Sequence, residues 1–245
     1  MKKTYFILLL TFVFSLNASA QTEYSLSLYD SVRERVIPVT VYSPKKVNHH
    51  TAVVVFSHGY DKNKDPQSNQ RYAYLNRYLA EKGYYVISIQ HEHPDDPPMP
   101  LTGGNFAVTR RSNWIRGKAN IMFTIDSFKA LKPSLNWKKL ILIGHSNGGD
   151  MSMLCIDEQP QLFYKGITLD SRRMRMPRTD SPRLYTLRGC DYEADEGVLP
   201  TEEEQKQYHM TVVKLDGIKH RDMGRRGTDD QHDIIKRKVY EFVKE

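Results

Sequence analysis

The pattern of apolar and polar positions predicts strands that alternate with helices along most of the chain. Two β-like runs, 24–29 and 36–42, are joined by the turn residues Asp30 and Ser31, which predicts an antiparallel pair. The continuous β-branched run at 51–56 is typical of a strand buried on both faces of a sheet. Further strands are expected at 84–90, 139–143, 166–169, 183–187 and 211–215, and helices at 70–82, 114–131, 150–157, 202–208 and 230–244.

This alternation favours an α/β fold with a mostly parallel central sheet and helices on both faces. The first two strands are expected to form an antiparallel edge. A long segment rich in Pro, Asp and Gly, from His91 to about Arg111, is expected to be a loop, and a loop of that length is either functional or mobile. We find no internal repeat and no linker, so residues 21–245 are expected to form a single domain.

The N-terminal segment has the features of a signal peptide. Lys2 and Lys3 precede an apolar run, and Ala18-Ser19-Ala20 is a small-residue cleavage site. The apolar run is shorter than the roughly 20 residues of a membrane span, so no stable span is expected. We therefore expect residues 1–20 to be removed after Ala20, and the protein to be secreted or periplasmic.

Composition and charge narrow the possible functions. The chain has 245 residues, of which 39% are hydrophobic and 27% charged, and this composition excludes a wholly disordered chain. The net charge of +7 falls to +5 without the leader, with 34 basic and 29 acidic side chains. The densest basic stretch, 172–175, lacks the aromatic side chains that stack on bases, so no nucleic-acid partner is expected. Cys155 and Cys190 are too few for a disulfide scaffold.

One motif carries the chemistry. The apolar run 140–143 leads into Gly144-His145-Ser146-Asn147-Gly148-Gly149, which contains the Gly-x-Ser-x-Gly pattern of a nucleophile on a tight strand-to-helix turn. Glycines two residues before and two after the serine allow the close backbone approach that this turn needs. The following helix N-terminus presents backbone N–H groups to developing negative charge. Ser146 is therefore the candidate nucleophile.

A serine nucleophile needs a base, and the base needs an orienting acid. His220 follows the last predicted strand and lies after Ser146 in the chain, so it is the candidate base. Asp191 follows the preceding strand and is preferred as the acid because its position, close to the strand end, is the best fixed. Asp195 lies four residues further into the same loop and is the alternative acid.

The two backbone donors of an oxyanion hole are expected at Asn147, which follows the nucleophile, and at Tyr60, in the loop after the early central strand. The glycine in His58-Gly59-Tyr60 allows that loop to turn close to the substrate oxygen. The Tyr60 ring either packs against the acyl group or serves ordinary loop packing.

Together these motifs resemble the α/β-hydrolase superfamily, and within it the secreted esterase, lipase and polyester-hydrolase branch. The resemblance spans nearly the whole chain after residue 20. It implies a Ser146–His220–Asp191 triad with oxyanion amides at Tyr60 and Asn147, and no cofactor. Many members insert a helical cap before the strand at 183–187, but only some 13 residues are available here, so no cap domain is expected.

The sequence thus predicts a serine hydrolase, with a small-molecule carboxylic ester as the expected substrate. A peptidase or amidase would use the same triad, and a non-catalytic binding protein with the same fold is the other alternative. His91, His93, Asp95 and Asp96 lie near one another in the sequence, but no third ordered ligand is evident and no metal site is expected. Arginines 172, 173, 175 and 178 either bind an acidic group of the substrate or form a solvated loop.

Overall fold

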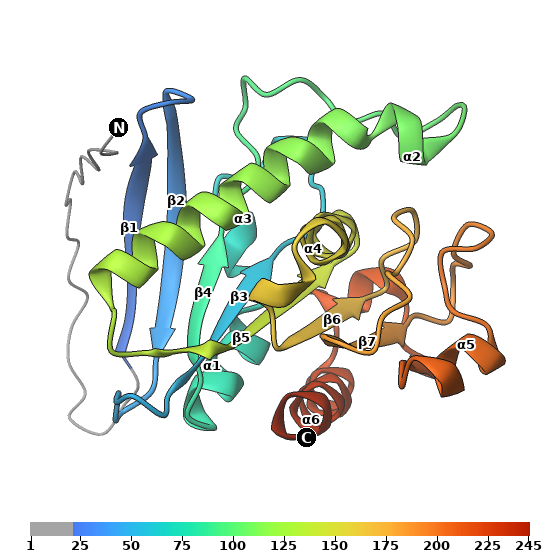
Figure 1. Ribbon diagram of the computed structural model, residues 1–245. Helices are drawn as coiled ribbons and strands as arrows, with labels where there is room; N and C mark the ends of the chain where they lie inside the picture. Colours follow the sequence, from blue (N-terminus) through green and yellow to red (C-terminus); the bar gives the residue numbers. More distant parts are fainter. Residues whose placement is uncertain (1–21) are drawn as a thin grey trace.

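A computed structural model describes residues 22–245 and shows one eight-stranded sheet with helices on both faces (Figure 1). The signal peptide predicted for residues 1–20 lies outside the described residues. The strands are β1 (Thr22–Asp30), β2 (Arg35–Ser43), β3 (Ala52–Ser57), β4 (Tyr85–Ile89), β5 (Asn136–His145), β6 (Lys165–Leu169), β7 (Arg183–Arg188) and β8 (Thr211–Lys214). The helices are α1 (Ala73–Glu81), α2 (Phe106–Thr109), α3 (Arg111–Leu131), α4 (Asn147–Glu158), α5 (Glu202–Gln207) and α6 (Asp229–Lys244).

The strand order is β1-β2-β4-β3-β5-β6-β7-β8. β1 pairs antiparallel with β2, and β2 antiparallel with β4, whereas every pair from β4 to β8 is parallel. The prediction of a mostly parallel sheet with an antiparallel N-terminal edge is therefore confirmed. All six residues of β3 are buried, as expected of an interior strand whose two faces are both covered by helices.

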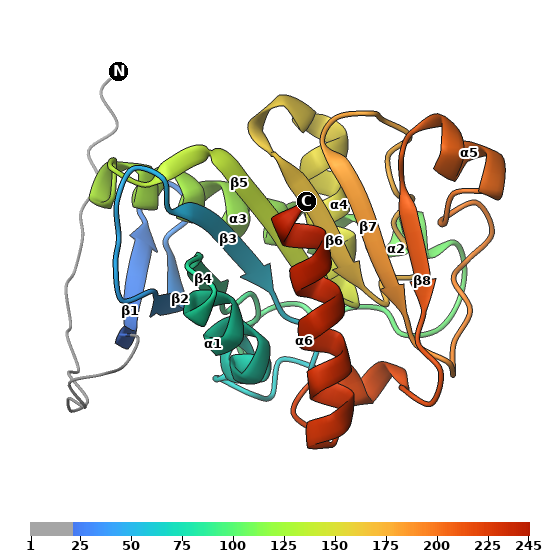
Figure 2. The same cartoon turned by 90° about the horizontal axis from the view of Figure 1, so that it is seen from below.

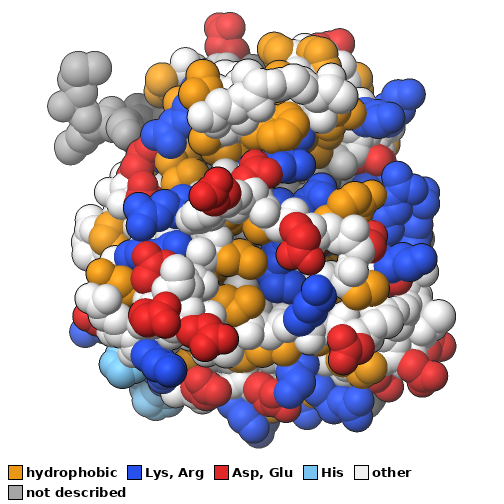
Figure 3. Space-filling model, turned by 90° about the vertical axis from the view of Figure 1, so that its right-hand side faces the viewer, with side chains coloured by type: hydrophobic (Ala, Val, Ile, Leu, Met, Phe, Trp, Pro, Cys, Tyr) orange, Lys and Arg blue, Asp and Glu red, His pale blue; other side chains and the backbone are white. Residues whose placement is uncertain are grey.

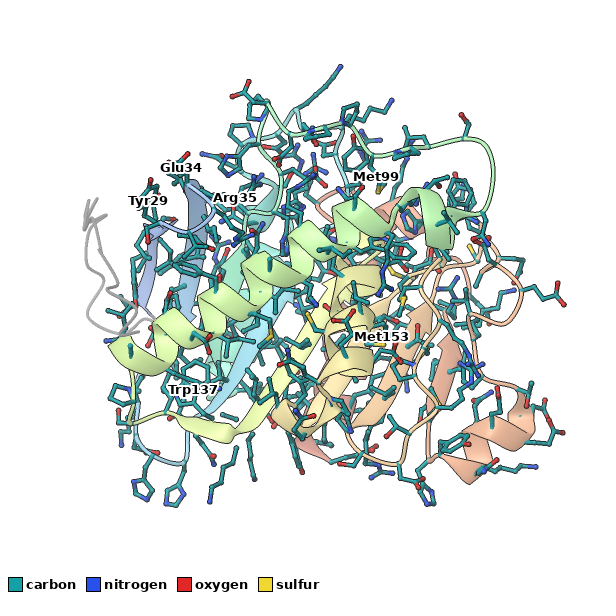
Figure 4. The ribbon with its side chains drawn as sticks, turned by 45° about the horizontal axis from the view of Figure 1, so that its top comes forward. Tyr29, Glu34, Arg35, Met99, Trp137 and Met153 are labelled. Atoms are coloured by element: carbon teal, nitrogen blue, oxygen red, sulfur yellow. The ribbon has the colours of Figure 1, made fainter. Side chains whose placement is uncertain are left out.

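Two hydrophobic cores fill the space between the sheet and its helices. On one face, α3 and α4 pack with residues such as Trp114, Ile121 and Met153. On the other face, α1 and α6 pack with Leu75, Leu79, Ile235 and Val239, and Figure 2 shows these two helices in front of the sheet. Met153, on the inner side of α4, and Trp137, near the start of β5, are labelled in Figure 4. Because helices cover both faces of the sheet, we expect the functional site among the loops at the ends of the strands.

The elements differ from the sequence predictions mainly at their ends. The loop after β4 contains the one-turn helix α2, and α4 begins at Asn147, directly after the candidate nucleophile, three residues earlier than expected. The connection from β6 to β7 contains no helix, which agrees with the prediction that no cap domain is present. Within residues 22–245, no helix is both long and apolar enough to cross a membrane.

Candidate active site

Ser146 occupies the tight turn between β5 and α4. Its backbone has φ 52° and ψ −122°, a left-handed conformation that is strained for a residue with a side chain. A Cβ at Gly144 would lie within 3.0 Å of the Gly148 backbone, and a Cβ at Gly148 would lie equally close to the carbonyls of Ser57 and His58. The glycines of the motif are therefore required by the close approach of three backbone segments, as the sequence analysis expected.

His220 lies just beyond β8 and lines the same pocket as Ser146. Its Nδ1 lies 2.5 Å from Oδ2 of Asp170, the residue that directly follows β6. This contact leaves Nε2 as the ring nitrogen free to serve Ser146. The carboxylate that orients the imidazole is thus Asp170, a residue that the sequence analysis did not consider.

The prediction that Asp191 or Asp195 orients His220 is wrong in this geometry. Asp191 is exposed, and its Oδ1 accepts the backbone N–H of His220 at 2.7 Å, so it contacts the main chain and not the imidazole. Asp195 forms an ion pair with Arg173. Asp191 therefore fixes the backbone of the His220 loop from the outside. Asp195, further along the same loop as Asp191, is instead tied to the loop after β6, because its N–H donates to the Arg172 carbonyl.

Asp170 is completely buried, with three partners for its carboxylate. Oδ2 faces His220, and Oδ1 accepts the Gly189 N–H at 3.0 Å and lies 2.9 Å from Nη2 of Arg188. Burial acts most strongly and would raise the pKa of Asp170, but the His220 hydrogen bond and the Arg188 charge outweigh it and hold the pKa below its ordinary value. An ionised Asp170 accepts a hydrogen bond from the Nδ1–H group of His220, which fixes the tautomer that a general base at Nε2 requires.

A chain of hydrogen bonds connects the three loops of the site through His145 and Tyr72. His145 Nε2 lies 3.0 Å from the His220 carbonyl, and Nδ1 lies 2.7 Å from the Tyr72 hydroxyl. Because a carbonyl only accepts, Nε2 carries the proton and the Tyr72 hydroxyl donates to Nδ1. Burial lowers the pKa of His145 well below its ordinary value, so the ring is neutral at pH 7. The Gly59 N–H in turn points to the Tyr72 hydroxyl at 3.4 Å.

His58 holds the loop after β3 in the same way. Its Nδ1 donates to the Gly59 carbonyl at 2.8 Å, because its Nε2 accepts the His91 N–H at 2.9 Å. Burial lowers the pKa of His58 to about 4, so this ring too is neutral and serves as a fixed spacer. The loop that carries Tyr60 is therefore held from both sides.

Tyr60 and Asn147 are the two residues whose N–H groups are predicted to form the oxyanion hole. Tyr60 lines the pocket beside Ser146, and its N–H has no acceptor among the described residues. Asn147 is the first residue of α4, so its N–H is one of those that a helix leaves unpaired. The Asn147 side chain is turned into α3, where it accepts from Trp114 Nε1 at 3.0 Å and donates to Asn113. The side chain of Asn147 is therefore occupied, and its backbone N–H is the group of this residue that is available to a substrate.

The Tyr60 ring has a role in the loop and not, through its hydroxyl, in the pocket. Its hydroxyl accepts the Met99 N–H at 3.0 Å and so ties the long segment after β4 to the loop after β3. Figure 4 shows Met99 on that segment. This contact supports a role of the ring in loop packing, and Tyr60 also lines the pocket, so contact with the acyl group stays a prediction.

The structure shows the surroundings of two further features of the sequence: the histidines and aspartates at 91–96, and the two cysteines. His91 Nε2 lies 3.0 Å from the Ser57 hydroxyl, and Asp96 pairs with Arg35 at 2.7 Å, at the hairpin end labelled in Figure 4. Residues 22–245 contain no group of three or more side chains placed to bind a metal ion. Cys155 is buried and Cys190 is exposed, and both are free.

Glu92 is a buried carboxyl group below the loop that carries Tyr60. Its side-chain Oε2 accepts the Asp61 N–H at 3.0 Å, whereas Oε1 has no hydrogen-bond partner in the described structure. Burial raises the pKa of Glu92 to about 8, against the opposing charges of Arg116 and Arg71. The folded protein therefore favours the neutral carboxyl over a range of pH in which the unfolded chain is ionised.

This shift predicts a pH-dependent stability that Glu92→Gln removes. The pKa is raised in the folded state, so the stabilisation is complete below the unfolded value near 4.5 and is lost as the pH rises to 8. Relative to wild type, Glu92→Gln should gain roughly 2–4 kcal/mol of unfolding free energy between pH 5 and pH 9. Urea unfolding at several pH values measures this, with the exposed Glu81→Gln as the control. Parallel stability curves for wild type and Glu92→Gln would contradict it.

The pocket at the carboxyl ends of the strands holds about 380 Å³. Its wall combines Ser146 and His220 with residues of the loop after β3, of the segment after β4, and of the loops around Arg172 and Arg225. Tyr192 stands edge-on to the His220 ring, with their centroids 5.7 Å apart. The sequence-predicted nucleophile, base and first oxyanion residue thus line one pocket, with the buried Asp170 behind the base.

Comparisons with known proteins agree on the fold. No protein-family model matches the chain, and no curated protein matches its sequence. Among solved structures, esterase Est22 superposes with a TM-score of 0.65 and 12% identity, covering 93% of this chain and 81% of that one. A lidless α/β serine hydrolase from Xanthomonas campestris gives a TM-score of 0.58 and 15% identity, covering 94% and 98%.

An acylaminoacyl peptidase from Pyrococcus horikoshii also matches, with a TM-score of 0.65 and 15% identity over 93% of this chain. The match covers only 42% of the peptidase, so this chain spans well under half of that protein. Identities at this level establish a fold and not an activity. The chain has the α/β-hydrolase fold, which it shares with esterases and with peptidases, and within the described residues it has no lid, like the Xanthomonas campestris protein.

Proposed function

We propose that this protein is a serine hydrolase that cleaves carboxylic esters through an acyl-enzyme on Ser146. One observation carries the proposal: a buried carboxylate, Asp170, lies 2.5 Å from Nδ1 of His220, and His220 shares a pocket with a serine on a strained strand-to-helix turn. A serine without a catalytic role would need neither a strained backbone nor a nearby imidazole oriented by a buried carboxylate.

The reaction follows from the roles of these groups. His220 takes the proton of the Ser146 hydroxyl as the serine oxygen attacks the ester carbonyl. The N–H groups of Tyr60 and Asn147 stabilise the negative charge on the carbonyl oxygen. His220 then protonates the leaving alcohol, and a water molecule activated by His220 releases the acid and restores Ser146. Asp170 stabilises the imidazolium at each step, and this chemistry requires no cofactor.

A panel of substrates tests the proposal against its alternatives. We expect purified protein to hydrolyse short-chain esters faster than peptide anilides, because an alkoxide leaves with less protonation than an amine. Ser146→Ala is the control in each assay. Hydrolysis of anilides alone would favour a peptidase or amidase of the same fold. Absence of both activities, together with no labelling of Ser146 by a fluorophosphonate, would favour a binding protein.

We also propose that the protein is exported, and this part of the proposal rests on the sequence pattern alone. Residues 1–20 have the features of a cleaved signal peptide, with Gln21 as the first residue of the mature chain. A secreted or periplasmic location would bring the enzyme into contact with esters from outside the cell.

A further inference from the structure

The wall of the candidate active-site pocket is strongly basic. Seven lysines and arginines line it, and the single acidic residue of the wall, Asp61, is ion-paired with Arg71. The basic members are Lys62, Arg71, Arg110, Arg172, Arg221, Arg225 and Arg226. The whole chain has 36 basic and 29 acidic residues, so its net charge does not explain this excess. On the face shown in Figure 3, lysine and arginine side chains gather on the upper part of the right-hand edge, so the surface charge is uneven.

Arg110 is the most deeply placed of these arginines. Only 8% of it is exposed, and its Nε donates to the Pro100 carbonyl at 2.9 Å. Its guanidinium carbon lies 4.3 Å from the centre of the Phe106 ring. Among the described residues no carboxylate lies within 4.0 Å of it, and its two terminal nitrogens have no hydrogen-bond acceptor. A nearly buried guanidinium that no carboxylate contacts directly is costly, and a bound anionic ligand would reduce that cost.

Arg172 lines the same pocket and comes two residues after Asp170. Its guanidinium carbon lies 4.3 Å from the centre of the Tyr192 ring, and no ion pair is formed within the described chain. Burial lowers the pKa of Arg110, and the charges of Arg173 and Arg172 lower it further, against the opposing charges of Asp150 and Asp195. Two like charges that lie close together repel, and an anion between them would relieve the repulsion.

Other arginines of the same region are neutralised by carboxylates. Arg173 pairs with Asp195, Arg178 with Glu204 at 2.8 Å, and Arg188 with Asp170. Within the pocket wall, Arg71 and Arg225 are also paired with carboxylates. Among the wall arginines that have no ion pair in the described chain, Arg221 and Arg226 are exposed to solvent, whereas Arg110 is buried and Arg172 is partly buried. A guanidinium held by an aromatic ring presents its donors to a carboxylate or phosphate as a fixed fork.

We propose that the substrate is an anionic ester, whose carboxylate or phosphate group is bound by Arg110 and Arg172 while its ester carbonyl lies at Ser146. This inference rests on the proposed ester hydrolysis and specifies its substrate class. It also resolves the two alternatives for the arginine-rich segment: Arg172 serves the substrate, and its neighbours serve the loop.

Matched substrates that differ only in charge test the proposal. On the acyl side, monomethyl adipate is compared with its monoamide, the neutral methyl 6-amino-6-oxohexanoate. On the alcohol side, 4-(butanoyloxy)benzoate is compared with 4-(butanoyloxy)benzamide. In at least one pair, kcat/KM for the carboxylate should exceed that for the carboxamide by roughly tenfold or more, and the ratio should fall as salt is raised. The pair that shows the effect identifies the side of the ester that carries the charge.

Variants assign the effect to the two arginines. Arg110→Gln and Arg172→Gln should each bring the carboxylate-to-carboxamide ratio close to one. Arg111→Gln is the matched control, because Arg111 is exposed, pairs with Glu158 at 3.0 Å and lies outside the pocket wall. Its ratio should equal that of wild type. The ratio compares two substrates with the same enzyme preparation. A general loss of folded protein lowers both rates equally and leaves the ratio unchanged.

Binding to Ser146→Ala separates this proposal from the proposed function. Calorimetry should show that adipate binds more tightly than adipamide, and that Arg172→Gln removes the difference. If no ester is hydrolysed but this contrast appears, the anion site stands and ester hydrolysis is wrong. If esters are hydrolysed through Ser146 with equal rates in both pairs, or adipate and adipamide bind alike, the anion site is wrong. Competition between adipate and inorganic phosphate then distinguishes a carboxylate from a phosphate group.

Discussion

Ser146→Ala is expected to lower kcat for ester hydrolysis by roughly 10⁴-fold or more. The hydroxyl is the atom that attacks the carbonyl, so no other group of the site replaces it. The residual rate would come from the oxyanion donors and from substrate binding. Because alanine removes only one oxygen and Ser146 is partly exposed, the fold should survive the change.

The measurement is kcat on one ester for wild type and Ser146→Ala, with thermal unfolding of both proteins as the control for folding. A variant that keeps more than about a tenth of the wild-type rate would show that Ser146 is not the nucleophile.

Asp170→Asn is expected to have the second largest effect, a fall in kcat of the order of 10²–10⁴-fold with a smaller change in KM. An asparagine keeps the shape but loses the charge that stabilises the His220 imidazolium, and its amide group can favour the wrong tautomer. The same change at Asp191 should cost less than about tenfold, because Asp191 contacts only the backbone N–H of His220.

This comparison needs a control for stability. Asp170→Asn leaves the buried Arg188 without its ion-pair partner, and breaking a buried pair costs about 3–5 kcal/mol. Rates should therefore be compared at a temperature at which circular dichroism shows both variants folded. If kcat falls by roughly 10²-fold or more in Asp191→Asn and stays close to the wild-type value in Asp170→Asn, the assignment of Asp170 as the acid is wrong. The proposal that the protein is a serine hydrolase would survive that result.

Much of the fold follows from local patterns that the sequence displays directly. The β-branched run of β3 and the apolar run of β5 predict interior strands because a residue buried on both sides has to be apolar. The glycines around Ser146 predict the elbow for an equally local reason, namely that a Cβ would collide with neighbouring backbone. Ser146 and Asn147 could therefore be proposed from the local motif, and His220 and Tyr60 from their places after predicted strands.

The acid could not be chosen in this way. Asp170 directly follows β6, whereas Asp191 comes three residues after the end of β7. Both acids therefore lie near the end of a parallel strand, and the sequence pattern does not say which of them faces His220. The structure decides by long-range contacts: the N–H of Gly189 and the side chain of Arg188 stabilise the buried charge at Asp170. A buried acid near a buried arginine has no signature in a linear pattern.

The hydrogen-bonded chain from Gly59 through Tyr72 and His145 to His220 was missed for a related reason. Tyr72 comes just before α1 and His145 ends β5, 73 positions apart, and each residue taken alone is an ordinary core position. Only the packing of α1 beside the carboxyl end of the sheet brings them together. Their role is to hold three loops in register, which sequence spacing does not report.

The central claim, a covalent acyl-enzyme on Ser146, is tested most directly by intact-protein mass spectrometry during turnover of an activated ester. Wild type mixed with 4-nitrophenyl butyrate and quenched within the first turnover should gain the mass of one butyryl group, and peptide mapping should place that group on Ser146. Ser146→Ala should gain no mass under the same conditions. An acyl group on another residue, or the same mass gain in Ser146→Ala, would contradict the account.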